Sequence, residues 1–402
     1  MTQEKALEIL KSRHNVFLTG EPGAGKTYTI NKLQEALRKL ARGCAITAST
    51  GIAATHINGI TIHSWSGMKI NERFDKLMLD AIKGSYAGRR IQDADVLIID
   101  EVSMLNAQFI TNLDGVLTYA RHDDRPFGGL KIVFVGDFFQ LPPVKGGFAF
   151  ESESWKIADL KVCYLTEQHR QNEPEFTEIL NAMRMGTMTP AQKQRLSQCV
   201  HSTPPATHLY THNEDVDAMN DREFNALPGK ARVFEAESYG NEFAVANIKK
   251  YCLSPEILKL KKDAVVMFTA NNFQEGYVNG TLGKVAGFND FDEPEILLST
   301  GQVIVPKKHD WKDDNEKNPA CFTQYPLRLA WAITVHKSQG MSLDAASLDL
   351  SKCFIPGQGY VAISRVRSLS GLHLTGINET AFRVDPKILA QDMEFRKQSD
   401  ET

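Results

Sequence analysis

The chain has 402 residues, of which 42% are apolar and 24% charged, and its formal net charge at pH 7 is −3. A chain of this length makes about two to four domains with ample core, and the composition is that of an ordinary soluble protein. The small negative charge excludes a cationic surface on all sides, so any nucleic acid must be held by a local basic groove.

The cysteines and the apolar runs limit the cellular environments in which the protein is expected. The six cysteines are scattered and form no CxxC pair, which argues against a zinc site or a disulfide framework and is typical of a reducing compartment. No apolar run is long enough to cross a membrane, and the start of the chain, MTQEKALEIL, is too polar for a secretory signal. The sequence therefore predicts a cytoplasmic protein with no membrane partner.

A phosphate-binding loop is the strongest signal, in the stretch NVFLTGEPGAGKTYTINKLQEAL. A buried strand is predicted at 16–18, the GxxxxGKT pattern runs from Gly20 to Thr27, and a helical periodicity follows. Glycines let backbone N–H groups turn toward phosphate oxygens, and the helix N-terminus adds partial positive charge. Lys26 is predicted to contact the β- and γ-phosphates, and the Thr27 hydroxyl to bind Mg²⁺.

The segment ADVLIIDEVSML predicts a second buried strand, which ends in Asp100 and Glu101. Asp100 is placed to hold Mg²⁺, and Glu101 to orient and deprotonate an attacking water. Taken alone, two carboxylates after a strand are as often a solvated strand end. Together with the phosphate loop they predict a nucleoside triphosphatase rather than a small-molecule kinase, because a carboxylate beside the metal ligand suits attack by water.

The segment KIVFVGDFFQLPPV opens as a third buried strand and then presents Asp137 and Gln140 before two prolines. A plain strand-to-turn interpretation is open, since Asp and Pro end many strands. In a parallel sheet of RecA type, this strand end would lie beside the γ-phosphate. The Gln140 amide could accept a hydrogen bond from the lytic water and donate one to a phosphate oxygen. We therefore predict a γ-phosphate sensor whose signal passes through the stiff segment 141–143.

Further motifs follow along the chain, namely TASTGIAATHINGITIHSW, EVSMLNAQFITNLDGVLTYAR, TEQHRQN, LRLAWAITVHKSQGMSL and GQGYVAISRVRSL. With these motifs, over about residues 1–380, the chain resembles superfamily-one 5′-to-3′ DNA helicases. The closest resemblance is to the PIF (petite integration frequency) family, with RecD-type and phage Dda-type helicases as relatives.

This resemblance implies an α/β fold with two RecA-like parallel-sheet lobes of the P-loop NTPase type. It also implies a small wedge insertion in the first lobe and a small β-barrel insertion in the second. ATP would close the cleft between the lobes, and hydrolysis would release it. The expected parts are a first lobe at 1–165 with the wedge at about 66–92, a second lobe at 166–257 and 326–385, a barrel at 258–325 and a tail at 386–402.

The same resemblance implies the roles of individual residues at the nucleotide site. Gln3 is expected to read adenine. Arg170 and Arg365 are expected to reach the γ-phosphate from the second lobe as arginine fingers, a role worth about 10³ to 10⁵ in rate in other P-loop enzymes. His169 stands where the family commonly has an aromatic residue, which puts its stacking on adenine in doubt. The expected catalytic residues are Lys26, Glu101, Gln140, Arg170 and Arg365; the expected ATP contacts are Gln3, Gly20, Gly23, Ala24, Gly25, Lys26, Thr27, Tyr28 and Gly340; and the expected Mg²⁺ ligands are Thr27 and Asp100.

Single-stranded DNA is expected to lie across both lobes, held by phosphate contacts and by stacking worth about 1–3 kcal/mol per base. The residues that match DNA contacts of the family are Thr50, Gly51, His63 and Pro142 in the first lobe and Thr334, His336, Lys337 and Ser338 in the second. An alternative for the stretch THINGITIHSW is a helix-to-strand turn, and we expect Trp65 to belong mostly to the core.

Two insertions and a tail complete the expected architecture. The segment 66–92 has the pattern of one short amphipathic helix, with Phe74, Leu77 and Ile82 among the residues of one face, and it is either the wedge that splits the duplex or a packing helix. Short strands with Asn-Gly and Gly turns at 258–325 predict a small barrel. It resembles the Src-homology-like barrel of the family and would cover the DNA channel or dock a protein. The final RKQSDET is expected to fray.

These features predict an ATP-dependent DNA helicase that translocates 5′ to 3′ on single-stranded DNA and unwinds duplex or forked DNA. Its expected cofactors are ATP and Mg²⁺, and it is expected to be monomeric in solution. The direction of travel rests on the resemblance alone, as do roles in DNA repair, DNA replication and telomere maintenance. An RNA helicase or remodeller on the same motor stays open, as do a non-enzymatic ATP-gated nucleic-acid clamp and a helicase-nuclease subunit. The expected catalytic residues argue against the clamp, because binding alone would not need them all.

Overall fold

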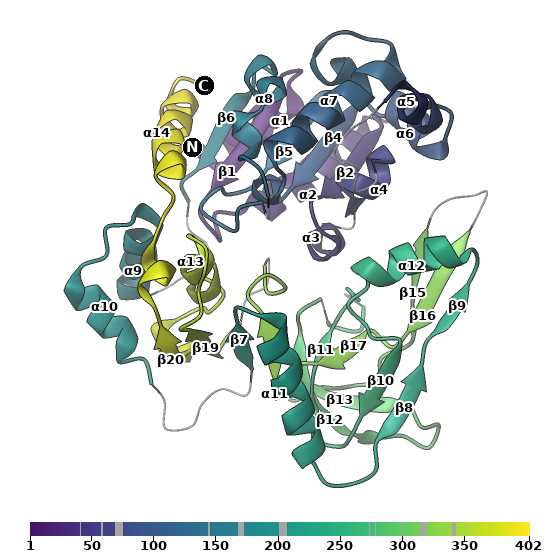
Figure 1. The fold of residues 1–402 in the computed structure, drawn as a ribbon, viewed down its shortest axis with the longest axis vertical. Coiled ribbons are helices and arrows are strands. Elements are labelled where there is room, and N and C mark those ends of the chain that lie inside the picture. Colours follow the sequence, from purple (N-terminus) through teal and green to yellow (C-terminus); the bar gives the residue numbers. More distant parts are fainter. Residues whose placement is uncertain are drawn as a thin grey trace. The chain divides into compact units, whose positions relative to one another are not determined.

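The computed structural model describes residues 1–40, 42–57, 59–68, 75–143, 145–167, 173–200, 207–272, 274–277, 279–298, 300–313, 319–339 and 343–402. The chain divides into two compact units, whose elements are labelled in Figure 1. Unit 1 comprises Met1–Pro190, Phe354–Ser364 and Glu379–Thr402, and unit 2 comprises Ala191–Cys353 and Arg365–Asn378. Three residues of the expected nucleotide site, His169, Arg170 and Gly340, lie outside the described residues, as does Phe74 of the expected wedge.

Unit 1 is built around a six-stranded sheet with the order β3-β2-β4-β5-β1-β6, in which every neighbouring pair is parallel. The strands are β1 (Val16–Gly20), β2 (Cys44–Ala48), β3 (Ile60–Thr61), β4 (Val96–Asp100), β5 (Lys131–Val135) and β6 (Lys161–Leu165). Most of their residues are buried, as in parallel sheets that are covered on both faces. Because β4, β5 and β1 are neighbours, the carboxyl ends of the three strands that carry expected site residues meet at one edge.

Helices and aromatic side chains cover the two faces of this sheet. The described helices of unit 1 are α1 (Gln3–Lys11), α2 (Lys26–Lys39), α3 (Gly51–His56), α4 (Ile62–Ser66), α5 (Lys76–Lys83), α6 (Tyr86–Asp93), α7 (Ala107–Arg121), α8 (Glu153–Ile157), α9 (Pro174–Met185), α13 (Gln358–Ile363) and α14 (Pro386–Asp400). Leu18 of β1 packs in a core shared with α1 and α2. Its neighbour Phe17 points to the other face, where its ring lies 5.1 Å from that of Trp155 in α8 and 4.8 Å from that of Phe395 in α14.

The segment expected to be one amphipathic wedge helix forms two helices, α5 and α6, in its described part. The Ser85 hydroxyl oxygen accepts hydrogen bonds from the N–H groups of Ala87 and Gly88 at 3.1 and 3.4 Å, and this cap starts a second helix. Leu77 is 80% exposed whereas Ile82 is 8% exposed, so the two do not share a buried face. The prediction of a single helix is therefore wrong, because the serine cap divides the segment.

The segment 386–402, expected to be a tail, is helical over most of its length as α14. The Asp385 side chain caps its first turn. Phe395 is buried, and the Ser399 hydroxyl oxygen accepts a hydrogen bond from the Tyr164 N–H at 3.1 Å. The expectation of a frayed tail is wrong because this helix buries one side against β6.

Unit 2 contains a second parallel sheet, with the order β18-β7-β19-β20. Its strands are β7 (His208–Tyr210), β18 (Ala332–Thr334), β19 (Ala346–Leu350) and β20 (Leu372–Ile377), and the helices along unit 2 are α10 (Pro190–Ser197), α11 (Asn213–Ala226) and α12 (Glu242–Tyr251). The Asn220 side chain of α11 donates a hydrogen bond to the Ala332 carbonyl and accepts one from the Ala332 N–H, both at 3.0 Å. These two bonds fix α11 on β18. No helix among the described residues of the chain has the length and apolarity that a membrane span needs.

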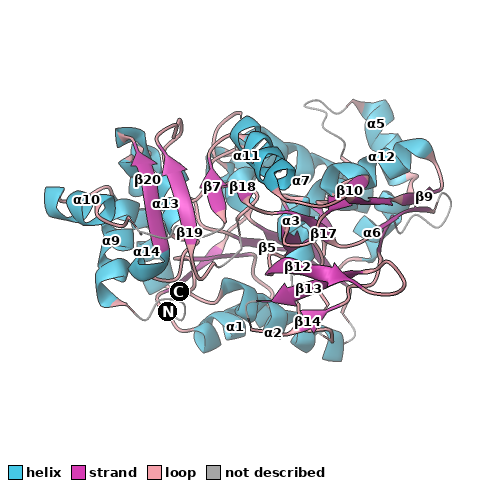
Figure 2. Cartoon of the chain, turned by 90° about the horizontal axis from the view of Figure 1, so that it is seen from below, coloured by secondary structure: helices cyan, strands magenta, loops and turns pink. Residues whose placement is uncertain are grey.

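The remaining strands of unit 2 are antiparallel (Figure 2). One sheet has the order β14-β13-β12-β11-β17, a second β15-β16-β9, and β10 pairs with β8. Their bounds are β8 (Arg232–Glu235), β9 (Glu237–Tyr239), β10 (Ile257–Leu260), β11 (Val265–Phe268), β12 (Leu282–Phe288), β13 (Pro294–Leu298), β14 (Val303–Ile304), β15 (His309–Asp313), β16 (Ala320–Gln324) and β17 (Leu327–Leu329). Strands thus occur where the sequence predicts them between 258 and 325; their assignment to a Src-homology-like barrel stays a prediction.

Candidate nucleotide site and nucleic-acid interface

The loop between β1 and α2 has the backbone that a phosphate cradle needs. Gly20, Gly23 and Gly25 have φ angles of 145°, 91° and 88°, which glycine adopts readily and other residues rarely do. A Cβ on Gly25 would lie 2.0 Å from Nε2 of Gln3, so a larger residue would displace the Gln3 side chain and strain the backbone. Helix α2 begins at Lys26 with no hydrogen bond from a capping side chain of the described residues, which leaves its first N–H groups open to an anion.

The Lys26 ammonium group folds back over this loop. Its Nζ donates hydrogen bonds to the carbonyl oxygens of Gly20 and Glu21 at 2.7 and 3.1 Å. Burial lowers the pKa of Lys26, and nearby carboxylates, Asp137 first, oppose that shift. Among the described residues, the hydrogen-bond acceptors of this cation are backbone carbonyls of the glycine loop, so the site fits a polyphosphate group.

The end of β4 places two acidic residues in succession. The Glu101 N–H donates a hydrogen bond to Oδ1 of Asp100 at 2.8 Å. Glu101 has φ 52° and ψ 44°, a left-handed conformation whose cost is of order 1–3 kcal/mol and which tends to persist at functional sites. Burial raises the pKa of Asp100 to about 6, against the effects of the Glu101 N–H and the Lys26 charge. A divalent cation would hold this carboxylate ionised, so the donor set fits Mg²⁺.

Gln140 follows β5, the strand between β4 and β1. Its N–H donates a hydrogen bond to the Asp137 carbonyl oxygen at 3.0 Å, which closes the turn after the strand. The residue is 5% exposed, and its Oε1 has no hydrogen-bond partner among the described residues. A buried amide oxygen without a partner carries a desolvation cost. It therefore fits an acceptor for a donor that arrives with the nucleotide, such as a water molecule.

Gly357, which precedes α13, packs directly on this turn. A Cβ on Gly357 would lie 2.9 Å from the Phe139 carbonyl oxygen and 3.0 Å from that of Gln140, and its φ of 83° also favours glycine. The sequence motifs do not predict this contact. The start of α13 must therefore respond to any displacement of the Gln140 backbone.

Gln3 lies against the phosphate loop. It is the first residue of α1, and its Nε2 donates a hydrogen bond to the Ala24 carbonyl oxygen at 3.2 Å. Thr27 and Tyr28, in the first turn of α2, are exposed, Tyr28 by 57%. Gln3 therefore contacts the loop, and Thr27 and Tyr28 are accessible to a ligand. The reading of adenine by Gln3 stays a prediction.

The first stretch expected to contact DNA begins as a capped helix. The Thr50 hydroxyl oxygen accepts a hydrogen bond from the Ala53 N–H at 3.2 Å, so Gly51 is the first residue of α3. Both residues are half-buried. A threonine cap leaves the N-terminal end of α3 defined and positively polarised, which suits a backbone phosphate.

Three further residues of unit 1 belong to this expected surface or its support. His63 in α4 is half-buried with its ring 4.6 Å from that of Phe109, and burial lowers its pKa, which favours the neutral ring. Trp65 is 4% exposed, which confirms its prediction as a core residue. Pro142 is half-buried beside the fully buried Leu141.

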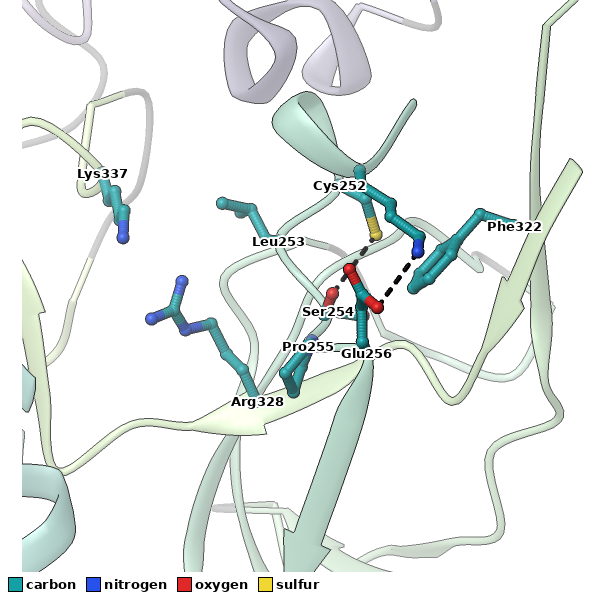
Figure 3. A pocket seen from close by; sticks show the side chains of 9 residues that line it. Cys252, Leu253, Ser254, Pro255, Glu256, Phe322, Arg328 and Lys337 are labelled. Atoms are coloured by element: carbon teal, nitrogen blue, oxygen red, sulfur yellow. Dashed lines mark hydrogen bonds and ion pairs between the residues drawn. The ribbon is translucent and has the colours of Figure 1, made fainter. Parts of the chain in front are cut away.

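The expected contacts of unit 2 lie in a turn at the end of β18. The Thr334 hydroxyl oxygen accepts a hydrogen bond from the Lys337 N–H at 3.2 Å, and the Ser338 N–H donates one to the Thr334 carbonyl oxygen at 3.0 Å. Burial lowers the pKa of both His336 and Lys337. Lys337 lines a cavity together with Arg328, as Figure 3 shows.

Arg365, the expected finger residue that the structure describes, belongs to unit 2. It is 2% exposed, and its carbonyl oxygen accepts a hydrogen bond from the Leu343 N–H at 2.8 Å. A guanidinium group this far from solvent needs polar or anionic neighbours. Its role as a finger stays a prediction.

Comparison with known proteins decides the family. A model described as PIF1-like helicase matches residues 3–194. The ATP-dependent DNA helicase Pif1 of Psychrobacter sp. (strain PRwf-1) is 39% identical over 466 residues, which cover 98% of this chain and 71% of that protein. This chain belongs to the PIF1-like helicase family.

Other PIF1-like helicases agree in sequence and in structure. ATP-dependent DNA helicase PIF1 of Homo sapiens is 34% identical over 96% of this chain, which spans only 62% of that protein. Pif1 helicase from Candida albicans superposes with a TM-score of 0.83 at 33% identity, covering 98% of each chain. Unliganded Pif1 from Bacteroides sp. superposes with a TM-score of 0.81 at 29% identity, covering 98% of this chain and 96% of that chain. The predicted family and the predicted α/β fold with RecA-like lobes are confirmed.

The motifs of this PIF1-like chain do not predict a buried ion pair behind the sensor turn. Oδ2 of Asp137 accepts a hydrogen bond from Nη1 of Arg184 at 2.5 Å, and the two side chains are 0% and 1% exposed. The Arg184 guanidinium also lies 4.0 Å from the centre of the Phe139 ring. Asp137 thereby ties the turn to α9. A lone aspartate before the sensor is the only local signal, because Arg184 lies in an ordinary helical pattern.

This ion pair continues into a polar network that reaches α14. Nη2 of Arg184 donates a hydrogen bond to the Tyr164 hydroxyl at 3.0 Å, and that hydroxyl donates to Oδ1 of Asp392 at 2.9 Å. Nε of Arg396 donates to Oδ2 of Asp392 at 2.8 Å. The network joins the sensor turn, α9, β6 and α14 inside unit 1.

Proposed function

We propose that this chain is an ATP-dependent DNA helicase, in which ATP hydrolysis drives movement along single-stranded DNA and the opening of a duplex. The observation that carries this function is the strand order β4-β5-β1 in unit 1. It brings together Asp100 and Glu101, Gln140 and the phosphate loop at one edge of a sheet. The two relatives described above are named ATP-dependent DNA helicases, which supports the same activity here.

Structures of Bacteroides Pif1 support the ligands that we propose. One is a complex with ADP-AlF4 and another is bound to single-stranded DNA, and each is 29% identical to this chain. A further structure concerns unwinding at forked double-stranded DNA by two coordinating Pif1 helicases. We propose that this chain binds single-stranded and forked DNA and is monomeric without DNA, which analytical ultracentrifugation with and without a fork would test.

Each expected residue at the edge of the unit 1 sheet has a chemical task. Lys26 and the backbone N–H groups of the loop hold the β- and γ-phosphates, and Thr27 and Asp100 hold Mg²⁺. The ion, when bound, neutralises charge that develops on the phosphate oxygens. Glu101 accepts a proton from the attacking water, and the unpartnered Oε1 of Gln140 accepts its other hydrogen bond and so orients it.

Residues outside this edge complete the proposed motor. Gln3 reads the adenine, and Arg170 and Arg365 stabilise the charge on the γ-phosphate in the transition state. Loss of the γ-phosphate changes the hydrogen bonds of Gln140, and the change passes to the rigid segment 141–143. The proposed DNA contacts that respond are Thr50, Gly51, His63 and Pro142 in unit 1 and Thr334, His336, Lys337 and Ser338 in unit 2.

Substitution of the proposed base tests the hydrolytic site. Glu101→Gln is expected to retain ATP and DNA binding, while steady-state hydrolysis falls by about 10²- to 10⁴-fold because no group takes the proton. Glu8→Gln, at an exposed position on α1, is the matched control and should keep full activity. Unchanged hydrolysis in Glu101→Gln would contradict the assignment.

The direction and the nucleic acid are tested on tailed substrates. The proposed 5′-to-3′ movement predicts unwinding of a duplex with only a 5′ single-stranded tail and none of a duplex with only a 3′ tail. Matched DNA and RNA strands should differ in how strongly they stimulate ATP hydrolysis, with DNA the stronger. Stimulation by RNA alone would replace the DNA helicase with the RNA remodeller.

A further inference from the structure

A cavity of about 310 Å³ lies in unit 2 between α12 and the strands that follow it (Figure 3). The residues that matter for its chemistry are Lys249, Cys252, Glu256, Phe322, Arg328 and Lys337. Its volume is at the small end of the range for ligand-binding pockets. The charged groups around it are divided into two sides that differ in how they are paired.

One side of the cavity is electrically neutral. Nζ of Lys249 pairs with Oε2 of Glu256 at 3.0 Å and also lies 5.9 Å from the centre of the Phe322 ring. Burial raises the pKa of the Cys252 thiol to about 12, so it stays protonated and unreactive. This side therefore offers neither a free charge nor a nucleophile.

The opposite side carries two cations that are not ion-paired within the described part of the chain. Arg328 and Lys337 make no ion pair and no side-chain hydrogen bond with any residue that the structure describes, and Nε of Arg328 is buried without an acceptor. Figure 3 shows the two side chains at the same end of the cavity, where they point toward each other. Burial lowers the pKa of both groups, and the charge of Arg328 lowers that of Lys337 further. Asp217 opposes both shifts, but it pairs with neither group.

Hydrogen bonds hold the backbone at both positions, in strand β17 for Arg328 and in the turn after β18 for Lys337. Arg328 lies in β17 opposite Met267 of β11. Lys337 is fixed by the hydrogen bond from its own N–H to the Thr334 hydroxyl oxygen. Two like charges fixed side by side away from water repel each other, and an anion placed between them would remove that repulsion.

We propose that this cavity is a phosphate subsite and that its ligand is a backbone phosphate of single-stranded DNA. This inference rests on the proposed helicase function, and it adds Arg328 to the DNA contacts, which the sequence motifs do not predict. The guanidinium fork binds two phosphate oxygens at once, and the lysine adds a point charge. Because Lys249 lies over the Phe322 ring and the proposed ligand is a phosphate rather than a base, the contact is independent of sequence.

The test is the salt dependence of binding to a fluorescent thymidine oligonucleotide. Each phosphate contact that is lost should lower the slope of log K against log salt by about 0.7 for a single strand. Arg328→Gln and Lys337→Gln should each show this decrease, and the double variant about twice as much. Arg328→Lys keeps the charge, so it should bind more weakly with an unchanged slope. Arg232→Gln removes an exposed arginine of the same unit and is the matched control with a wild-type slope.

Two further probes identify the source of the phosphate. An oligonucleotide of abasic residues has the same backbone without bases, and it should show the same loss of slope in Arg328→Gln. A loss seen only with bases present would overturn the phosphate assignment. Binding of inorganic pyrophosphate that depends on Arg328, without any change in the slope for DNA, would assign the cavity to free anions and overturn the DNA assignment.

The outcomes separate this subsite from the helicase function. If the wild-type protein binds single-stranded DNA and Arg328→Gln and Lys337→Gln keep its slope, the subsite is wrong and the function stands. If the wild-type protein does not bind single-stranded DNA, both fall. Thermal unfolding of each variant shows whether it folds. If Arg328→Gln does not fold, the affinity of Arg328→Lys for single-stranded DNA, compared with that of the wild type, decides the assignment.

Discussion

Arg184 in unit 1 and Arg328 in unit 2 are both withdrawn from solvent, but their surroundings differ. Arg184 pairs with Asp137 at 2.5 Å and donates a further hydrogen bond to the Tyr164 hydroxyl. Arg328 makes no ion pair and no side-chain hydrogen bond with a described residue, whereas the lack of an acceptor for Nε among the described residues is common to both arginines. The Arg184 side chain is bonded to several elements of unit 1, whereas the described residues offer the Arg328 side chain no hydrogen bond or ion pair.

The pKa values of the two arginines show what this difference means. Burial lowers the pKa of Arg328, and Asp217 opposes the shift only in part. Burial is the largest single effect on the pKa of Arg184 as well, but the charge and hydrogen bond of Asp137, together with Tyr360 and Tyr164, outweigh it, so that pKa lies well above its usual range. A buried cation needs an anion. Unit 1 supplies that anion from its own chain, and in unit 2 we propose that DNA supplies it.

The largest effect is expected from Asp137→Asn, which removes the closest anion of the buried Arg184 and leaves it, among the described residues, only the longer ion pair to Asp392, at 3.6 Å. Removal of one partner of a buried ion pair costs about 3–5 kcal/mol, so the free energy of unfolding should fall by that amount. Urea unfolding followed by circular dichroism measures it. Asp123→Asn breaks the exposed pair with Arg125 and is the matched control, with little loss expected. Similar small losses in both variants would remove the contrast between the two arginines.

Replacement of both partners by apolar residues separates stability from positioning. In the double variant Asp137→Leu and Arg184→Met no charge is left unpaired, so most of the stability lost in Asp137→Asn should return. The turn at Phe139 and Gln140 loses its anchor, however, and misplacement of the sensor should lower kcat by about 10- to 10²-fold. The KM for ATP should change less than kcat, because no residue of the phosphate loop is replaced and Lys26 loses only the nearby charges of Asp137 and Arg184, which act on it in opposite senses. Full turnover in this variant would make the ion pair purely structural.

The nucleotide edge is the part of this molecule that the sequence predicts best. The phosphate loop and the pair Asp100 and Glu101 lie at the ends of short apolar strands, and Gln140 lies in the turn after β5, so the groups of the proposed site are encoded within a few residues. The parallel order of β4, β5 and β1 then brings them together. Local patterns suffice because each strand end carries its own functional group.

The support behind that edge could not be predicted in the same way. Asp137 and Arg184 are 47 positions apart, and neither has a local signal for the other. In α14, the buried Asp392 and Ser399 interrupt the apolar face, so the segment has the composition of a solvated tail. Their burial makes sense only once Tyr164 is known to bond to both. Polar networks between distant elements leave little trace in periodicity.

Lys131 is intermediate between Arg184 and Arg328, because its buried charge is neutralised by no carboxylate of the described residues but is hydrogen-bonded to carbonyl groups. Its Nζ donates hydrogen bonds to the carbonyl oxygens of Leu10 and Ser12 at the end of α1, and burial lowers its pKa to about 8. The unfolded chain keeps the proton up to its ordinary pKa, so folding is penalised below pH 8 and stability should increase as the pH rises from 8 toward 10.5. Between pH 8 and about 9.5 the gain should be about 1 kcal/mol after allowance for solvent screening. Urea unfolding at both pH values measures it, and Lys131→Met should lack this gain; an equal gain in the variant would assign it to other groups.

The smallest change in stability is expected from Arg328→Gln, and it is the sharpest test of the comparison. The substitution removes a withdrawn charge that has no ion pair among the described residues, so the free energy of unfolding should stay within about 0.5 kcal/mol of the wild-type value. Arg184→Gln, the matched change in unit 1, should cost several times as much because it leaves Asp137 unpaired. Addition of single-stranded DNA should raise the melting temperature of the wild type more than that of Arg328→Gln, since a ligand stabilises the folded state in proportion to its affinity. If Arg328→Gln instead destabilises the protein as much as Arg184→Gln does, the fold itself uses that guanidinium, and a paired and an unpaired arginine cannot be told apart by their contacts.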